Sequence, residues 1–383
     1  MQFDWDEEQL AYRDLLAEFA RRELDGDLPQ RDRGQVFPAE AWRKCAAVGV
    51  QGLPVPVDYG GSGAPATTIA LALETLGHAC RDAGLLFSLN AQMWACETPI
   101  VRFGSEEQRQ AYLPRLCDGS LIAAHGMSEA DSGSDAFALS TTARPTRDGS
   151  GYVLNGAKVW TTNAPVAGLF VVFATTDRAK GLSGLTAFLV ERETPGLEVL
   201  GPVEKMGLRT SPMGELVLTD CEVPASARLG SEGAGMAIFN SSMEWERGFI
   251  LASGLGAARR QLEQAVAYAK QRRQFGQPIA SFQAISHRLV DMRVRLDAAR
   301  SLLYDLAWRK QQGRGAAVES AVVKLFCSEA IVQCALDAQT IYGAAGYTCD
   351  LDLEREVRDA LASRVYSGTS DIQRNLIAQR MGL

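Results

Sequence analysis

One glutamate interrupts an apolar helical face and has the chemistry of a buried base. Residues 239–251 (FNSSMEWERGFIL) have helical spacing, and Phe239, Met243, Glu246 and Ile250 fall on one side of that helix. A carboxylate there is costly to bury unless it is paired or functional. Burial also raises the pKa of a carboxyl, which a base needs in order to take a proton from carbon. An ion pair between Glu246 and a basic neighbour is the alternative.

The elements around this glutamate change character twice along the chain. The N-terminal part has helical apolar spacing, with Leu10, Leu15, Leu16 and Phe19 as one stripe. The middle part contains short β-type runs bounded by Gly, Pro, Asn or Asp. Helical spacing then returns over four stretches, residues 242–273, 281–312, 315–342 and 352–381.

These changes predict an α+β protein built from three parts. We expect an N-terminal helical domain over residues 1–119 and a middle β-barrel or sandwich domain over 120–229. A C-terminal four-helix bundle follows over 230–383. No G-x-G-x-x-G motif follows a predicted strand, and no phosphate-binding P-loop is present, so any cofactor must be bound in another way.

The composition argues against several classes of protein. A net charge of −7 lacks the basic concentration that phosphate binding needs, so we expect no nucleic-acid partner. The eight cysteines include no C-x-x-C pair and only three histidines occur, so we expect no metal site. The N-terminus is acidic where a signal peptide would be basic and then apolar, and no apolar run approaches the ~20 residues that span a bilayer. These features favour a cytoplasmic protein without a membrane partner.

Four segments together resemble the acyl-CoA dehydrogenase family and occur in the family's order. They are residues 127–135 (MSEADSGSD), 158–163 (KVWTTN), 272–276 (RRQFG) and 366–374 (YSGTSDIQR). The family's helical, β and helical-bundle arrangement agrees with the three predicted parts. The resemblance implies FAD-dependent α,β-dehydrogenation of an acyl thioester, with flavin N5 as the hydride acceptor.

The resemblance also implies which residues contact FAD. It places Ser128 at the pyrimidine end of the flavin, Trp160 against the ring and the Thr162 hydroxyl at N5. It brings Arg272 to the FAD pyrophosphate of a neighbouring subunit, which implies a homotetramer. A core tryptophan, or arginines at a helix C-terminus, are the plainer interpretations. The full set is Met127, Ser128, Gly133, Ser134, Trp160, Thr162, Arg272, Phe275, Gly343, Thr369 and Asp371.

The fourth segment departs from the commonest family pattern. Most members have a catalytic Glu directly before Gly-Thr-Ser, and this chain has Ser367 there. Isovaleryl-type members, which also lack that Glu, place the base at a Glu-Arg pair that matches Glu246 and Arg247. The resemblance therefore makes Glu246 the base and the Ser367 backbone N–H a donor to the thioester oxygen, with Arg247 and Gly368 at the substrate.

Three further strings resemble prolyl carrier-protein dehydrogenases: residues 162–165 (TNAP), 208–214 (LRTSPMG) and 241–247 (SSMEWER). They favour an acyl or aminoacyl group on a carrier protein in a biosynthetic pathway. An acidic carrier would need a basic rim, for which Arg259, Arg260, Lys270 and Arg273 are candidates, although a solvated helix face gives the same charge run.

Three other functions stay open at this point. They are dehydrogenation of a free acyl-CoA, an oxygen-using oxidase or monooxygenase on the same fold, and a non-catalytic partner. No motif specifies the electron acceptor. Gln92, Met93, Trp94 and Phe249 are candidates for the walls of the acyl pocket.

Overall fold

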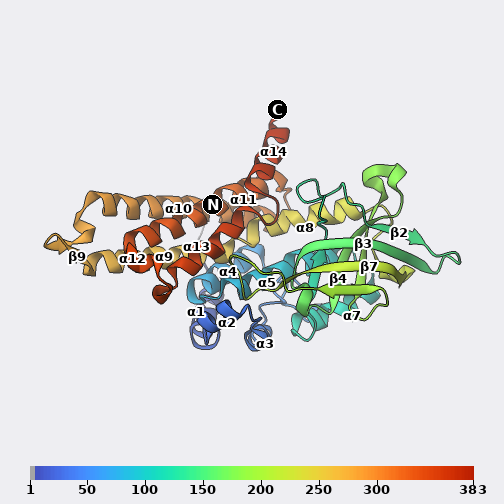
Figure 1. The fold of residues 1–383 in the computed structure, drawn as a ribbon, viewed down its shortest axis with the longest axis horizontal. Coiled ribbons are helices and arrows are strands. Elements are labelled where there is room, and N and C mark those ends of the chain that lie inside the picture. The colour runs from blue at the N-terminus through green and yellow to red at the C-terminus, as the bar shows by residue number, and fades with distance from the viewer. Residues whose placement is uncertain (1–4) are drawn as a thin grey trace.

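A computed structural model describes residues 5–383, so the first four residues of the acidic N-terminal stretch lie outside the described part. Figure 1 shows a long helical bundle at one end, a β sheet at the other, and the N-terminal helices packed along both. The three predicted parts are therefore present. Helix α8 (Gly235–Phe249) runs between the sheet and the bundle.

The N-terminal part consists of helices whose ends follow from the sequence. Both α1 and α7 begin with a capping box, Asp6 with Gln9 and Ser105 with Gln108. On α1, Leu16 and Phe19 are buried as expected, but Leu15 is 54% exposed and the prediction for it is wrong. The helices are α1 (Glu7–Glu23), α2 (Leu28–Gly34), α3 (Ala39–Ala47), α4 (Ala66–Ala79), α5 (Ala83–Gln92), α6 (Thr98–Phe103) and α7 (Glu106–Cys117), with a π-helix, η2 (Met93–Glu97), after α5.

Helix α4 is almost entirely buried because it is covered by α1, α9 and α10. It approaches α9 so closely that a Cβ on Gly77 would lie 1.8 Å from the Ser253 carbonyl oxygen, so only glycine fits there. The buried Glu74 carboxylate accepts hydrogen bonds from the Arg300 guanidinium at 2.5 Å and from the Tyr304 hydroxyl at 2.6 Å. These bonds fix α4 to the bundle.

The middle part is one eight-stranded sheet, in the order β6-β7-β3-β2-β4-β5-β8, with β1 parallel to β4. The expected barrel or sandwich is thus a single sheet with apolar side chains on both faces. Alternate residues of β4 face the two sides, and the Val171 and Phe173 side packs on α8 through Ile238. The strands are β1 (Ala123–Gly126), β2 (Thr142–Pro145), β3 (Gly151–Thr162), β4 (Leu169–Thr175), β5 (Leu185–Glu191), β6 (Leu197–Leu200), β7 (Met213–Pro224) and β8 (Arg228–Leu229).

The C-terminal bundle differs from the prediction at two places. The expected helix 242–273 begins earlier and is interrupted at Ile250 and Leu251. The expected helix 352–381 stops at Leu361 and resumes only at Ser370. The elements after α8 are α9 (Ala252–Gln271), a small hairpin of β9 (Arg273–Gln274) and β10 (Gln277–Pro278), α10 (Gln283–Gln311), α11 (Ala317–Tyr342), α12 (Ala344–Tyr347), α13 (Leu353–Leu361), the 3₁₀ turn η8 (Ala362–Arg364) and α14 (Ser370–Met381).

Within residues 5–383, no helix is long and apolar enough to cross a membrane. Over the same range, no three His, Cys, Asp or Glu side chains gather in a way that could hold a metal ion.

Candidate active site

Helix α8 carries the candidate base from the sheet to the bundle. Its first turns pack on the sheet through Ile238, and the Ser242 hydroxyl donates to the Trp94 carbonyl of η2 at 3.1 Å. Its later turns pack on α11. As the apolar spacing predicts, Met243 and Ile250 are buried, and so is Glu246, which is only 9% exposed.

The two oxygens of the Glu246 carboxylate are in different situations. Oε1 accepts a hydrogen bond from the Ser367 hydroxyl at 2.5 Å, across 121 residues of sequence. Oε2 is buried and has no hydrogen-bond partner in the part of the chain that the structure describes. One oxygen is thus held in place, and the other is free to accept a proton.

The surroundings of Glu246 act on its pKa in two directions. Burial raises the pKa of its carboxyl above the ordinary value, and this effect is the largest. The Ser367 hydroxyl and the positive charges of Arg247 and Lys324 act in the opposite direction. Arg247 is half-buried and its Nε has no partner within residues 5–383. Its predicted contact with substrate stays a prediction.

The interruption between α13 and α14 is what brings Ser367 to Glu246. Ser367 and Gly368 both have left-handed backbones, with φ of 56° and 89°, so the chain cannot continue as a helix. The Gln373 amide donates to the carbonyls of Ser367 and Gly368 at 3.2 and 2.9 Å, and the Thr369 hydroxyl caps α14. The Ser367 backbone N–H donates to no group in the described chain, which leaves it available as a donor.

A buried ion pair shapes the Ser/Gly-rich loop after β1. Lys158 of β3 is fully buried, and its Nζ lies 2.8 Å from Glu129 and 3.2 Å from the Met127 carbonyl oxygen. The Glu129 carboxylate also accepts hydrogen bonds from Ser140 and Thr141. In addition, the Ser128 carbonyl accepts from the Val159 N–H at 2.9 Å, so the loop is fixed to β3.

The same loop lies beside an exposed tryptophan. Trp160 has a left-handed backbone (φ 54°) and is 56% exposed, and a Cβ on Gly133 would lie 3.8 Å from its ring. Ser134, the residue after Gly133, is exposed, and Thr162, the last residue of β3, is half-buried. A flat aromatic face beside hydroxyls and accessible backbone fits a planar ring that carries hydrogen-bonding groups, as an isoalloxazine does.

Four other predicted FAD residues lie in the C-terminal bundle and are exposed. Arg272 and Phe275 are exposed at the β9–β10 hairpin, which Figure 1 places at the end of the bundle away from the sheet. Phe275 is 91% exposed. Gly343 is exposed after α11, and the exposed Asp371 forms an ion pair with Arg374 at 2.8 Å. Their predicted contacts with FAD stay a prediction.

A cavity of about 70 Å³ begins one turn beyond Glu246, beside Ile250. The rings of Phe87 and Tyr366, whose centroids are 4.8 Å apart, also line this cavity. Tyr366 directly precedes Ser367, so one wall of the cavity adjoins the segment that carries the Ser367 hydroxyl.

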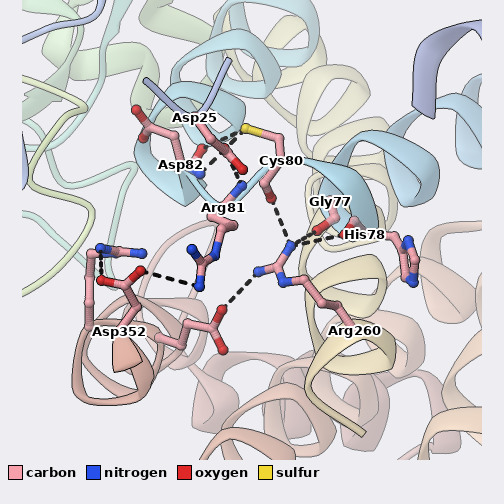
Figure 2. A network of polar contacts seen from close by, with 10 residues as sticks. Asp25, Gly77, His78, Cys80, Arg81, Asp82, Arg260 and Asp352 are labelled. Atoms are coloured by element: carbon pink, nitrogen blue, oxygen red, sulfur yellow. Dashed lines mark hydrogen bonds and ion pairs between the residues drawn. The ribbon is translucent and has the colours of Figure 1, made fainter. Parts of the chain in front are cut away.

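The far end of the cavity is polar, and Figure 2 shows the network there. The Arg260 guanidinium donates to the carbonyls of Gly77, His78 and Cys80 at 2.7, 3.1 and 2.8 Å, and to Glu356 at 2.9 Å. These bonds close the α4–α5 loop against α9 and α13. Arg260 is only 9% exposed, so the prediction that it belongs to a basic docking rim is wrong.

The side chains predicted to wall the acyl pocket lie in the core. Gln92, Met93, Trp94 and Phe249 are fully buried, and none of them lines this cavity. Trp94 packs on Phe249 with ring centroids 5.1 Å apart, and the Gln92 amide donates to Glu97 at 2.8 Å. Phe249 ends α8 and the other three lie on α5 and η2, so they pack these elements together. Their predicted contact with an acyl group stays a prediction.

Sequence reasoning missed three residues that shape the site: Phe87, Glu129 and Lys324. Only Lys324 carried a usable signal, because it interrupts the apolar run of α11 as Glu246 interrupts that of α8. Phe87 looks like any apolar residue of a buried helix, and the Glu129–Lys158 pair joins residues that only the fold brings together.

Models of known protein families match nearly the whole chain. The N-terminal, middle and C-terminal domains of acyl-CoA dehydrogenase match residues 6–120, 124–221 and 233–382. A relative from Serratia sp., named L-prolyl-[peptidyl-carrier protein] dehydrogenase, is 43% identical and the match covers 95% of this chain and 94% of the relative.

Solved structures agree with these matches. The crystal structure of the prolyl acyl carrier protein oxidase AnaB has a TM-score of 0.97 and 48% identity, over 99% of this chain and 100% of AnaB. The structure of PigA with FAD and proline has a TM-score of 0.97 and 42% identity, over all of both chains. This chain belongs to the acyl-CoA dehydrogenase family.

Proposed function

We propose that this protein is an FAD-dependent dehydrogenase that removes hydrogen from the α and β carbons of an acyl or aminoacyl thioester on a carrier protein. One observation carries the proposal: the buried Glu246 carboxylate has one oxygen held by Ser367 and the other without a partner. The family membership and the names of the relatives support the choice of reaction and substrate.

Bound FAD would supply the hydride acceptor for the β carbon. The residues suited to hold it are the loop at Met127 and Ser128, with Gly133 and Ser134, the exposed face of Trp160, and Thr162. PigA, which is 42% identical over all of both chains and has been solved with FAD, supports FAD as the cofactor.

Glu246 would act as the general base. Its free Oε2 would take the α-proton while Oε1 stays bonded to the Ser367 hydroxyl. Burial makes the carboxylate a stronger base because its pKa is raised. Negative charge that develops on the thioester oxygen needs a fixed donor, and the Ser367 N–H, which has no partner in residues 5–383, can supply one.

The carrier-bound substrate is the finer part of the proposal. Relatives whose names give a prolyl group on a carrier protein are 43% and 48% identical over nearly the full chain. The cavity lined by Phe87 and Tyr366 is small, about 70 Å³, and a compact acyl group is the kind that such a volume suits. A free short or branched acyl-CoA is the alternative substrate, since it presents the same thioester.

The name of AnaB supports a second candidate function, in which oxygen accepts the electrons, because AnaB is called an oxidase. Consumption of oxygen and formation of peroxide without an added electron acceptor would favour the oxidase function.

We also propose that the protein is a homotetramer, in which Arg272, Phe275, Gly343 and Asp371 meet the FAD of a neighbouring copy. The exposure of these four residues supports this arrangement.

Glu246→Gln tests the function. With FAD bound, we expect the wild-type protein to bleach its flavin anaerobically when mixed with L-prolyl carrier protein, and the product to lose the mass of two hydrogens. The variant should keep its flavin and lose at least about 100-fold in rate. Glu244→Gln is the matched control, because Glu244 lies on the same helix and pairs with Lys310 outside the site. Wild-type turnover by Glu246→Gln would show that the base is elsewhere, and a wild-type protein purified without FAD would favour a non-catalytic role.

A further inference from the structure

A second charged side chain is buried next to Glu246 and has no assigned role. Lys324 of α11 is fully buried, yet no carboxylate lies within ion-pair distance of it in the described chain. Its Nζ donates to the Ser363 carbonyl at 2.7 Å and stands 5.5 Å from the centre of the Tyr366 ring. A buried cation without a paired anion is costly, so its presence needs a reason.

Lys324 contacts the turn between α13 and α14, residues 362–369, which carries Ser367. Ser363 belongs to η8 and Tyr366 directly precedes Ser367, so one ammonium group holds two points of the segment that presents the Ser367 hydroxyl. Nearby residues of α11 hold the same segment, because Glu329 pairs with Arg364 at 2.6 Å and accepts from Ser370 at 2.8 Å. Lys324 differs from these anchors because its charge also acts on Glu246.

The groups that face Glu246 come from four elements. Arg247 lies on its own helix, Lys324 on α11, Tyr366 and Ser367 on the turn, and the buried Cys96 thiol on η2. Only Arg247 and Lys324 are positively charged. Burial lowers the pKa of Lys324 to about 8, and Arg247 acts in the same direction while Glu246 and Glu329 oppose it. The ammonium form therefore predominates at neutral pH.

We propose that Lys324 is a positioning residue of the reaction: it keeps the buried Glu246 carboxylate ionised and fixes the turn that aims Ser367 at it. The inference rests on the proposed function, because it concerns the state of the proposed base. A purely structural lysine would stabilise the fold without any effect on how activity depends on pH.

Three substitutions separate charge from hydrogen bonding. Lys324→Gln can still donate to the Ser363 carbonyl but has no charge, Lys324→Met has neither, and Lys324→Arg has both. The measurement is the rate of anaerobic flavin reduction by L-prolyl carrier protein across a pH series, with flavin content and melting temperature recorded for each protein.

In Lys324→Gln the acidic limb of the profile should move to higher pH, with a plateau near that of the wild type. Lys324→Met should show the same displacement and a plateau lower on the order of 10- to 100-fold, the loss expected when a reacting group is misplaced. Lys324→Arg should restore the wild-type profile. If Lys324→Met does not fold, the Gln and Arg variants still decide the matter.

A flavin-bound Lys324→Gln protein with the wild-type profile would overturn the inference. So would equal losses of folded protein in all three variants with no displacement of the profile. Failure of the proposed function is distinguishable, because the wild-type protein itself would then not reduce its flavin with the thioester.

Discussion

Removal of one hydroxyl, by Ser367→Ala, tests how the proposed base is held. The Ser367 hydroxyl donates to Glu246 at 2.5 Å, and a hydrogen bond to a charged group contributes about 1.5–3 kcal/mol. Its loss acts on the ionised carboxylate, which is the form that removes the proton. Since about 1.4 kcal/mol corresponds to tenfold in rate, flavin reduction on the acidic side should slow roughly 10- to 150-fold.

The sign of the pH effect follows from the site. Burial already raises the pKa of Glu246, and the Ser367 hydroxyl opposes that rise. Without the hydroxyl the pKa rises further, so the carboxylate becomes ionised only at higher pH. The acidic limb should therefore move to higher pH, while the plateau changes little because the backbone N–H of residue 367 remains.

The assay is single-turnover flavin bleaching with a carrier-bound thioester, without oxygen, over a series of pH values. Ser241→Ala is the control, since Ser241 lies on α8 and its buried hydroxyl has no partner within the described residues. It should leave the profile unchanged. A Ser367→Ala protein whose profile coincides with that of the wild type would refute the reasoning, because the hydrogen bond would then have no effect on the base.

Two further predictions concern the residues around the site. Phe87→Ala should enlarge the cavity that Phe87 lines. It should raise kcat/KM for longer acyl thioesters relative to compact ones by about fourfold per added methylene, or ~0.8 kcal/mol each. Competition between thioesters of different acyl length measures this preference, and an unchanged preference would contradict the prediction. Glu129→Gln should leave the Lys158 charge buried and lower the free energy of unfolding by about 3–5 kcal/mol, seen by calorimetry as a lower Tm. Burial raises the pKa of Glu129, but hydrogen bonds from Lys158, Ser140 and Thr141 outweigh it and lower the pKa to about 2. The difference in unfolding free energy between wild type and variant should therefore be present in full near neutral pH. It should disappear only as the pH falls toward that value. Addition of Lys158→Met to Glu129→Gln should recover much of the loss, and an unchanged Tm in the single variant would show that the pair does not stabilise the fold.

Periodicity was sufficient to predict that Glu246, the proposed base, is buried. Glu246 lies on the face that Met243 and Ile250 share, and all three are buried. The same reasoning failed for Leu15, because a seventeen-residue helix packed along one side buries only Leu16, Phe19 and Ala20 fully. An apolar residue beside the stripe is then left in water, and spacing alone does not tell which one.

The sequence also predicted one continuous helix where the structure has an interruption. Nothing in residues 352–381 forbids a helix except Gly368, and a single glycine costs a helix only about 1 kcal/mol. The interruption depends on tertiary contacts from Lys324 and Glu329 of α11, which hold the turn in place. Local propensity contains no information on such contacts, so a functional turn of this kind is hard to predict from one sequence.

The hydrogen bond between Ser367 and Glu246 restricts which side chains the two positions can carry together. A glutamate at position 367 would place a second carboxylate against the first, and two carboxylates that close cannot both be ionised. A serine there supplies a donor instead, which fixes one oxygen of Glu246 and leaves the other free. Under the proposed function, serine at 367 therefore supports a base on α8, and the backbone N–H of that residue is unaffected by which side chain it carries. A base at 246 in place of one at 367 thus needs a carboxylate at the first position and a donor at the second, which is the arrangement that this chain has.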